Sequence, residues 1–446
     1  MKSFTLLFAM LLLAPAFPGI HAQDTKAIVG ATLIDGTGRA PIKDAVILIE
    51  GERIKAVGPS GSTRVPEGAQ VIDAGGKFVI PGLADMHNHL YSDSLGLTEG
   101  PPDFKKILMR ILGCGFTLVF DPASRSLESF SEFKRASAEA DTPYPRYFGV
   151  YRTFGAEGGH GPQSKFTPET PDEARAAVRQ LKATGTDAVK IYHTNLIYVT
   201  KQVRPMLKSD VLRAIIEEAH RQGLKTYTHS PVLEHAKEAL RAGVDGLAHG
   251  ILSDPVDDEF IALMKRNGAV YVSTHAVFES VADVAGWTRR AADMDVRKLV
   301  PRQIYELGTD PNNTKRWEAK WNNLAYMKDR LPTLRANLRK VYDAGIPVVL
   351  GSDSAGGFVG LASQIELALQ AESGLTPQEV LQTATINAAR MIGREKDLGS
   401  IEPGKLADMV VLDADPLADI RNVRFVHRVI KGGRIYDPAE LFQRAK

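Results

Sequence analysis

The sequence has little cysteine and little net charge. Cys114 is the sole cysteine among 446 residues, so no disulfide can form within the chain. The formal net charge is only +2, which gives no reason to expect a nucleic-acid partner or a membrane surface. With 44% hydrophobic and 24% charged residues, the composition is that of an ordinary globular protein. The length allows one large domain with an appendage, or a few small domains.

The first residues differ from the rest of the chain. Lys2 precedes the apolar run FTLLFAMLLLAPAF, and the small residue Ala22 ends the segment. This pattern predicts a secretory signal peptide over residues 1–22, and therefore a periplasmic or secreted protein. The run is short for a membrane-spanning helix, and no cysteine near the cleavage point could carry a lipid. We therefore expect no membrane attachment after cleavage, with an uncleaved anchor as the alternative.

Both ends of the mature chain are predicted to form short β-strands. Residues 23–80 and 397–446 alternate apolar and polar residues between Gly, Asp and Pro turns, as in DAVILIEGERIKAVG and ADMVVLDADP. We expect the two segments to pair into one small β-sandwich domain.

The middle of the chain repeats a helix, a glycine and an apolar strand. The glycines of the six copies are Gly115, Gly185, Gly223, Gly243, Gly268 and Gly345. Each stands where a helix end needs a left-handed residue. The runs that follow are short and rich in Val, Ile, Leu and Tyr, as buried parallel strands are. With 81–90 and 145–151 they make eight strands, so residues 81–396 are predicted to form an α/β fold, a (β/α)8 TIM barrel.

A long charged connection, residues 276–345, separates predicted strands 7 and 8. It carries all three tryptophans, Trp287, Trp317 and Trp321. Insertions of this kind on a barrel rim act as lids or pocket walls. An oligomer contact or simple decoration is the alternative.

Polar side chains stand where the predicted barrel strands end. These strand-end residues are His89, Asp121, Lys190, His229, His249, His275 and Asp353. The C-terminal strand ends of such a barrel form one rim, where active sites lie. His87 and His89 lie two apart, so on a strand both imidazoles would face the same way. Four histidines at strand ends, from eleven in the chain, predict a metal site.

These residues resemble the amidohydrolase superfamily. The H-x-H pair, Lys190, His229, His249 and Asp353 match its binuclear-metal pattern in order and placement. GGHG at 158–161, AGVDGLAHG at 242–250 and LGSD at 350–353 resemble its imidazolonepropionase-like branch. That branch includes metal-dependent Xaa-Pro dipeptidases (prolidases) and ochratoxinase-type amidases. The resemblance covers nearly the whole mature chain and includes the flanking β-sandwich.

The resemblance implies two divalent metal ions, with zinc as the first expectation. The implied ligands are His87, His89, Lys190, His229, His249 and Asp353. In the family the lysine is N6-carboxylated, and its carbamate bridges both metals. An ordinary ammonium would repel a cation, and a lysine within a buried strand needs a partner or a modification. An ion-paired barrel lysine is the alternative, and manganese, iron or cobalt are alternatives to zinc.

The implied reaction is the attack of a metal-bridging hydroxide on an amide or peptide bond, in a dipeptide or an N-acyl amino acid. Asp353 would take the proton of the hydroxide and pass it to the leaving amine. His160 and Tyr192 would contact the substrate carbonyl or the oxyanion, and His275 would contact the substrate. For these three, a structural role is the alternative. Structural roles are expected for His193, His220, His235, His427, Asp121 and Cys114.

Other reactions remain open for the same site. A lactonase, a phosphotriesterase or a cyclic-amide hydrolase would use the same metals. A one-metal deaminase or imidazolonepropionase-type reaction is disfavoured, because mononuclear members lack the bridging lysine. A non-catalytic binding protein is disfavoured because the ligand set would then have no purpose. The sequence predicts a small-molecule substrate but no particular arginine as a carboxylate clamp, and it leaves the oligomeric state open, although barrels of this family often pair.

Overall fold

The computed structural model describes residues 25–90, 103–124, 126–139, 142–295, 297, 299–300, 302–355, 358 and 360–445. The predicted signal peptide, residues 1–22, lies outside the described residues. Within those residues, every helix is too short or too polar to cross a membrane.

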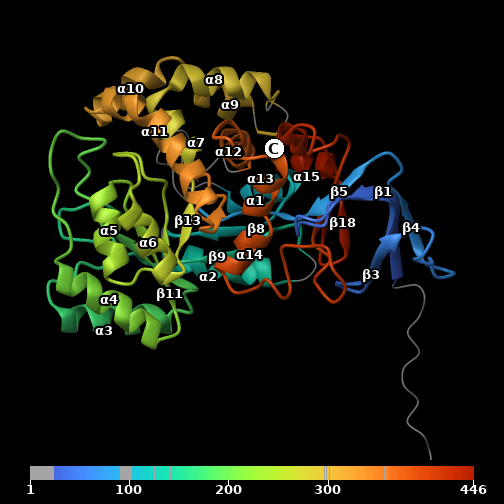
Figure 1. Cartoon of the computed structure of the whole chain (residues 1–446), viewed down its shortest axis with the longest axis horizontal. Helices are drawn as coiled ribbons and strands as arrows, with labels where there is room; N and C mark the ends of the chain where they lie inside the picture. Colours follow the sequence, from blue (N-terminus) through green and yellow to red (C-terminus); the bar gives the residue numbers. More distant parts are fainter. Residues whose placement is uncertain are drawn as a thin grey trace, which may run out of the picture.

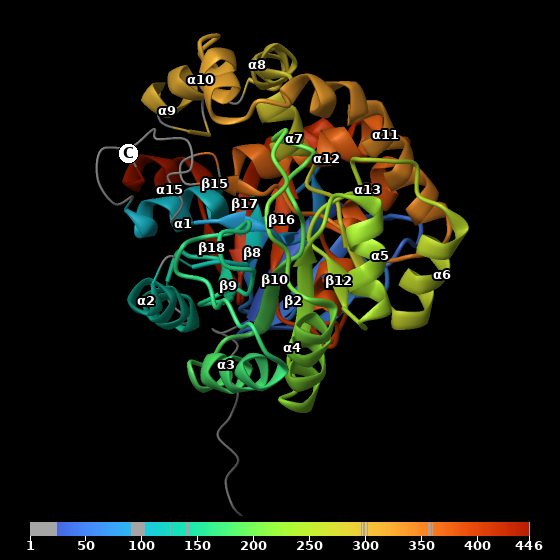
Figure 2. The same cartoon turned by 90° about the vertical axis from the view of Figure 1, so that its left-hand side faces the viewer.

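The described residues contain eight parallel strands at the centre of the molecule (Figures 1 and 2). They are β6 (Leu83–Asp85), β8 (Phe116–Asp121), β9 (Arg146–Gly149), β10 (Ala188–Tyr192), β11 (Lys225–His229), β12 (Gly246–Leu247), β13 (Val270–Val272) and β14 (Val348–Val349). Parallel pairing joins β6, β8 and β9, and joins β10 to β14 in chain order. Backbone hydrogen bonds from Asp187 to Gly149 (3.0 Å) and from Met86 to Leu350 (2.9 Å) link the two groups. The strands therefore have the TIM-barrel-like arrangement of an α/β fold.

The helix–glycine–strand repeat forms as predicted. All six glycines have a positive φ, from 59° at Gly268 to 98° at Gly243, a region that residues with a side chain rarely adopt. The helices before these glycines are α1 (Phe104–Gly113), α3 (Pro171–Ala183), α4 (Ser209–Arg221), α5 (Leu233–Arg241), α6 (Asp258–Asn267) and α11 (Leu324–Asp343). The other helices of this part are α2 (Leu127–Ala138), α12 (Leu361–Glu372), α13 (Pro377–Thr383) and α14 (Ile386–Met391).

The two chain ends pair into one mixed sheet beside the barrel (Figure 1). Its strands are β1 (Thr25–Leu33), β2 (Ile42–Glu50), β3 (Arg53–Pro59), β4 (Gln70–Asp73), β5 (Phe78–Pro81), β16 (Met409–Leu412), β17 (Val426–Lys431) and β18 (Arg434–Tyr436). β16 joins β5 in antiparallel register, which unites the N-terminal and C-terminal parts. The 3-10 helix η4 (Ile420–Arg424) precedes β17, and α15 (Pro438–Arg444) follows β18. Ile47, Val79 and Met409 belong to a core of this sheet that is separate from the barrel core. The two-layer sandwich stays a prediction.

The connection between β13 and β14 is helical. Before α11 it contains α7 (His275–Ala282), α8 (Val284–Asp293), α9 (Arg302–Gly308) and α10 (Asn313–Lys320). Figure 1 shows α8, α9 and α10 gathered at the top of the view, next to the barrel. We call the described residues of 275–323 the cap.

A buried carboxyl joins the start of the cap to α12. Glu366 is fully buried and accepts hydrogen bonds from the Ser273 hydroxyl (2.5 Å) and the Ala276 amide (2.6 Å). Burial raises the pKa of the Glu366 carboxyl from the ordinary 4.5 to about 8. The folded state therefore holds this proton more tightly than the unfolded state does. The stability that this gives is complete below the ordinary pKa and is lost as the pH rises toward the folded-state pKa.

Replacing Glu366 with glutamine should test this pH dependence. The Glu366→Gln variant should be less stable than the parent chain near pH 5, because an amide has one acceptor oxygen where the carboxyl has two. The deficit should shrink between about pH 5 and pH 8, by at most about 1.4 kcal/mol per pH unit. Urea unfolding across this range measures the deficit. The exposed control Glu217→Gln should show no such trend, and a deficit that stays constant or grows would contradict the assignment.

Candidate active site

A cavity of about 750 Å³ lies at the C-terminal ends of the barrel strands. All six predicted metal ligands line it: His87, His89, Lys190, His229, His249 and Asp353. His160 and Tyr192 line it as well. The structure thus brings together eight of the nine site residues that the sequence predicted.

The H-x-H histidines converge on Asp353, although a bend at Met86 and His87 interrupts the strand. β6 ends at Asp85, and β7 (Asn88–His89) begins after a bend, where it pairs with β15 (Ser354–Ala355). The Nε2 atoms of His89 and His87 lie 3.0 Å and 3.4 Å from Asp353 Oδ1. Their shared direction therefore comes from a bend and not from one regular strand.

Each of three histidines has one ring nitrogen engaged by a neighbouring group. The distances are 2.8 Å from His87 Nδ1 to the Ala248 carbonyl, 2.9 Å from His249 Nδ1 to the Thr274 hydroxyl, and 2.8 Å from His229 Nε2 to the Tyr198 hydroxyl. Such partners fix the orientation and the tautomer of metal-binding histidines. The opposite ring nitrogens, Nε2 of His87, Nε2 of His249 and Nδ1 of His229, are not engaged by these partners.

The charge states suit metal binding. Burial lowers the pKa of His87, His229 and His249 well below 6.5, and neighbouring positive groups lower it further, so these imidazoles are neutral. Ligand atoms of His87, His249 and Asp353 all lie within 4.8 Å of one another. The His229 and His249 ring centroids are 4.2 Å apart.

Lys190 lies within this group on β10. Its side chain is almost fully buried, and Nζ lies 3.4 Å from His87 Nε2. Burial lowers the pKa of Lys190 to about 7, although the Asp353 carboxylate raises it. Among the described residues, Asp353 is the carboxylate whose charge acts on Lys190, so the alternative of an ion-paired barrel lysine stays open. Neutral imidazoles, one carboxylate and a buried lysine together fit a site for divalent metal ions.

Two residues of the site have strained backbones. Thr274 has φ 50° and Asp353 has φ 49°, and a β-branched residue in the left-handed region is a clear outlier. Such a conformation costs on the order of 1–3 kcal/mol and is characteristic of functional sites. Here it places the Thr274 hydroxyl against His249 and the Asp353 carboxylate between the histidines.

His160 and Tyr192 form one wall of the cavity. The His160 ring lies edge-on to Tyr192 at 4.7 Å and 4.4 Å from His229, measured between centroids. Burial lowers the pKa of His160 to about 3, so its imidazole is neutral. Both side chains can therefore offer an uncharged polar group to a substrate.

The structure does not bring His275, the predicted substrate contact, into the cavity lining. β13 stops at Val272, and the chain turns through left-handed Thr274, so His275 becomes the first residue of α7. It is buried, lies 3.3 Å from the Ser373 hydroxyl, and does not line the cavity. The structural alternative holds for this residue.

Asp121 and His193, two of the residues expected to be structural, form hydrogen bonds with protein groups, and Asp121 Oδ1 also lies 4.0 Å from His89 Nδ1. Asp121 accepts a hydrogen bond from the Ala123 amide (3.1 Å) at the turn after β8, as predicted. His193 pairs with Glu238 at 2.9 Å, outside the cavity lining.

Sequence reasoning missed Asp85, Thr274 and Tyr198. The fully buried Asp85 carboxylate accepts hydrogen bonds from the His87 amide (3.1 Å), the Ser352 amide (3.1 Å), the Ser352 hydroxyl (2.6 Å) and the Ser363 hydroxyl (2.5 Å). A signal for Asp85 existed, because it continues the i, i+2 series of His87 and His89. Tyr198 lies in an irregular loop after β10, where no periodicity marks it.

A barrel with this ligand set at its rim defines a class of metal-dependent hydrolases. The model of the amidohydrolase family matches residues 78–436, and the chain belongs to this family. It is accordingly a metal-dependent hydrolase that acts on carbon–nitrogen bonds.

Named relatives differ in their reactions. The chain is 28% identical over 429 residues to an imidazolonepropionase of Geobacillus kaustophilus, covering 88% of this chain and 90% of that one. It is 24% identical over 456 residues to an ochratoxinase of Aspergillus niger, covering 92% and 86%. The fold is similar to a crystal structure of a Xaa-Pro dipeptidase, with a TM-score of 0.72 and 24% identity over 93% of this chain and all of that one. The solved A. niger ochratoxinase gives 0.71 at 22% identity, over 93% and 96%.

Replacing Asp85 should loosen the site without touching a metal ligand directly. The Asp85→Asn variant should lose about 3 kcal/mol of unfolding free energy, because an amide cannot accept all four hydrogen bonds. Its affinity for divalent metal should fall as well, since His87 and Asp353 lose their alignment. Urea unfolding and metal titration measure the two effects. The exposed control Asp329→Asn should change neither, and unchanged metal affinity in Asp85→Asn would refute the positioning role.

Proposed function

We propose that this protein is a binuclear metal-dependent amidase that cleaves an amide or peptide bond in a dipeptide or an N-acyl amino acid. The observation that carries the proposal is the closeness of His87, His249 and Asp353, with Lys190 Nζ 3.4 Å from His87. The ochratoxinase and the Xaa-Pro dipeptidase among the similar proteins support an amide substrate. Two bound divalent ions would polarise the carbonyl and supply an ionised water at neutral pH.

The residues of the chain have separate tasks in this proposal. His87, His89, His229, His249 and Asp353 would hold the metals, with zinc as the first expectation. Lys190, carboxylated on Nζ, would supply an anionic oxygen ligand.

Proton transfer and stabilisation of the oxyanion are further tasks for side chains that line the cavity. Asp353 carries the proton to the leaving amine. The Tyr192 hydroxyl and His160 face the cavity and would donate hydrogen bonds to the oxygen that becomes negative.

The relatives named imidazolonepropionase favour a second candidate, the opening of a cyclic amide. A one-metal version of that reaction has no use for Lys190. A library of dipeptides, N-acyl amino acids, cyclic amides, lactones and phosphotriesters separates the candidates. Turnover of lactones or phosphotriesters alone would overturn the amidase proposal.

Metal analysis tests the binuclear site. The chain should bind about two equivalents of divalent metal, and a value near one would remove the bridged arrangement. The Lys190→Ala variant should lose metal and activity, and short carboxylic acids should restore part of both by supplying the missing oxygen ligand. The exposed control Lys182→Ala should keep both metals. Full activity in Lys190→Ala would exclude the carbamate.

Replacing Tyr192 and Tyr198, the two tyrosines of the cavity, should have different effects. Tyr192→Phe should lower kcat about 100-fold while metal content stays unchanged, because a donor to the oxyanion is lost. Tyr198→Phe should weaken metal binding about tenfold or more, because its hydroxyl orients His229. Steady-state kinetics and metal titration separate these outcomes. Metal loss in Tyr192→Phe, or unchanged metal affinity in Tyr198→Phe, would reverse the assigned roles.

A further inference from the structure

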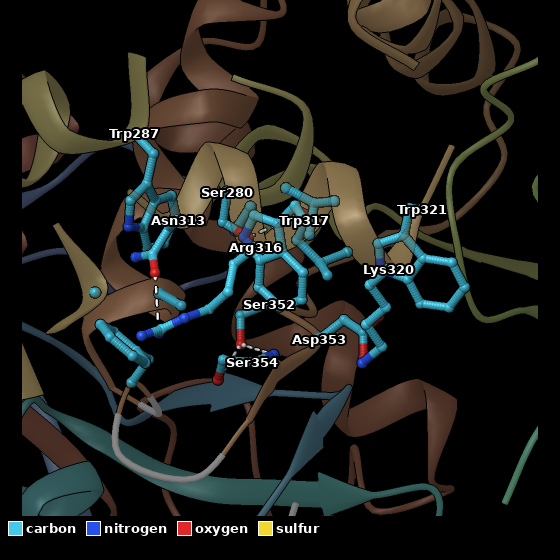
Figure 3. A pocket seen from close by; sticks show the side chains of 16 residues that line it. Ser280, Trp287, Asn313, Arg316, Trp317, Lys320, Trp321, Ser352, Asp353 and Ser354 are labelled. Carbon is cyan, nitrogen blue, oxygen red and sulfur yellow. Dashed lines mark hydrogen bonds between the residues drawn. The ribbon is translucent and has the colours of Figure 1, made fainter. Parts of the chain in front are cut away.

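A second cavity of about 190 Å³, whose lining residues are drawn in Figure 3, adjoins the first. Five residues line both cavities: Val277, Val281, Lys320, Trp321 and Asp353. We call this second cavity the side chamber. Because Asp353, a predicted metal ligand, lines both cavities, a group inside the side chamber would lie next to the reacting bond.

The walls of the side chamber are mainly apolar, and four of the lining residues are aromatic. All three tryptophans of the chain, Trp287, Trp317 and Trp321, line it together with Phe358. Gly308 of α9 leaves room for Phe358, because a Cβ there would meet the ring at 1.9 Å. An apolar cavity of roughly 150 Å³ is known to hold benzene, so the side chamber has room for one ring or a branched alkyl group.

The side chamber is also positively charged. Arg316 and Lys320 enter it from α10, one turn apart, and Asp353 is the sole carboxylate among its described lining residues. Arg316 donates a hydrogen bond to the Asn313 side-chain oxygen (3.2 Å) and forms no ion pair with the described residues. Figure 3 shows the Arg316 side chain extended along the chamber toward Asn313, with Lys320 and Trp321 at the opposite end. A guanidinium held in this way is suited to a carboxylate.

We propose that the side chamber binds the half of the substrate that is released as the amine, and that this half is an aromatic or branched aliphatic amino acid with a free carboxylate. The ring or alkyl group packs against Trp317 and Phe358, and Arg316 supplies the counter-charge. The assignment to the amine half rests on the proposed amidase function, in which Asp353 delivers the proton to that half. The binding chemistry itself rests on the lining residues alone.

Tryptophan emission tests the binding directly, because every tryptophan of the chain lies in the side chamber. Three probes separate the contributions: 3-phenylpropionate has ring and charge, 3-phenylpropanol has the ring, and acetate has the charge. The metal-loaded protein should bind 3-phenylpropionate most tightly, with a clear change in emission. Equal affinity for 3-phenylpropanol, or an equal response to acetate, would overturn the proposal.

Variants of α10 then test whether Arg316 supplies the positive charge that binds the carboxylate. Arg316→Gln should weaken binding of 3-phenylpropionate about tenfold and leave 3-phenylpropanol unchanged, and Arg316→Lys should recover part of the loss. The neighbouring control Lys315→Gln, exposed and outside the lining, should bind like the parent chain. Binding by Arg316→Gln that equals the parent chain would overturn the role of Arg316.

Hydrolysis separates this inference from the proposed function. N-acetyl-L-phenylalanine should have a higher kcat/KM than N-acetylglycine, and Trp317→Ala should reduce the ratio. If neither compound is hydrolysed but 3-phenylpropionate still binds as described, the amidase function fails and the side chamber stands. If both are hydrolysed equally and 3-phenylpropionate does not bind, the side chamber fails and the amidase function stands.

Discussion

The carboxylate of Asp85 links the ends of the first and last barrel strands, β6 and β14. Two predicted metal ligands, His87 and Asp353, follow these strands. The Asp85 carboxylate accepts four hydrogen bonds: one from the His87 amide, two from Ser352, the residue before Asp353, and one from Ser363 on α12. A carboxylate in this position is costly to bury, and burial raises its pKa, so only the full set of donors makes the arrangement stable. The backbone bond from the Asp353 amide to the His87 carbonyl (2.6 Å) completes the link. The protein itself thus fixes the relative position of His87 and Asp353, two of the predicted metal ligands.

Rigidity at this edge explains why the protein tolerates strain next to it. Thr274 and Asp353 adopt left-handed conformations that an isolated chain would avoid. The Thr274 hydroxyl orients His249, and Asp353 reaches three histidines with one carboxylate. The strained backbone therefore directs the Thr274 hydroxyl and the Asp353 carboxylate towards the histidines. Regular strand geometry would not place these groups there.

The sequence predicted the structure best at positions where a single physical requirement selects the residue type. Left-handed glycines such as Gly115 and Gly243 marked the repeat, because few other residues end a helix in that way. Polar residues after buried strands, such as His229 and Asp353, marked the rim. His275 was misplaced because nothing local shows that β13 ends before it. Tyr198 was missed because its loop is positioned by tertiary contacts, including the hydrogen bond from the Asn323 side chain to the Ile197 carbonyl (2.8 Å).

The cap lies entirely between β13 and β14, whereas the metal ligands stand at strand ends on either side of it. One continuous stretch of sequence therefore builds most of the side-chamber wall, and scattered single residues build the reactive centre. Changes in that stretch can reshape which molecules are accepted while the ligands keep their positions. The part of the chain that would select a substrate is therefore separable, as one exchangeable segment, from the residues predicted to hold the metals.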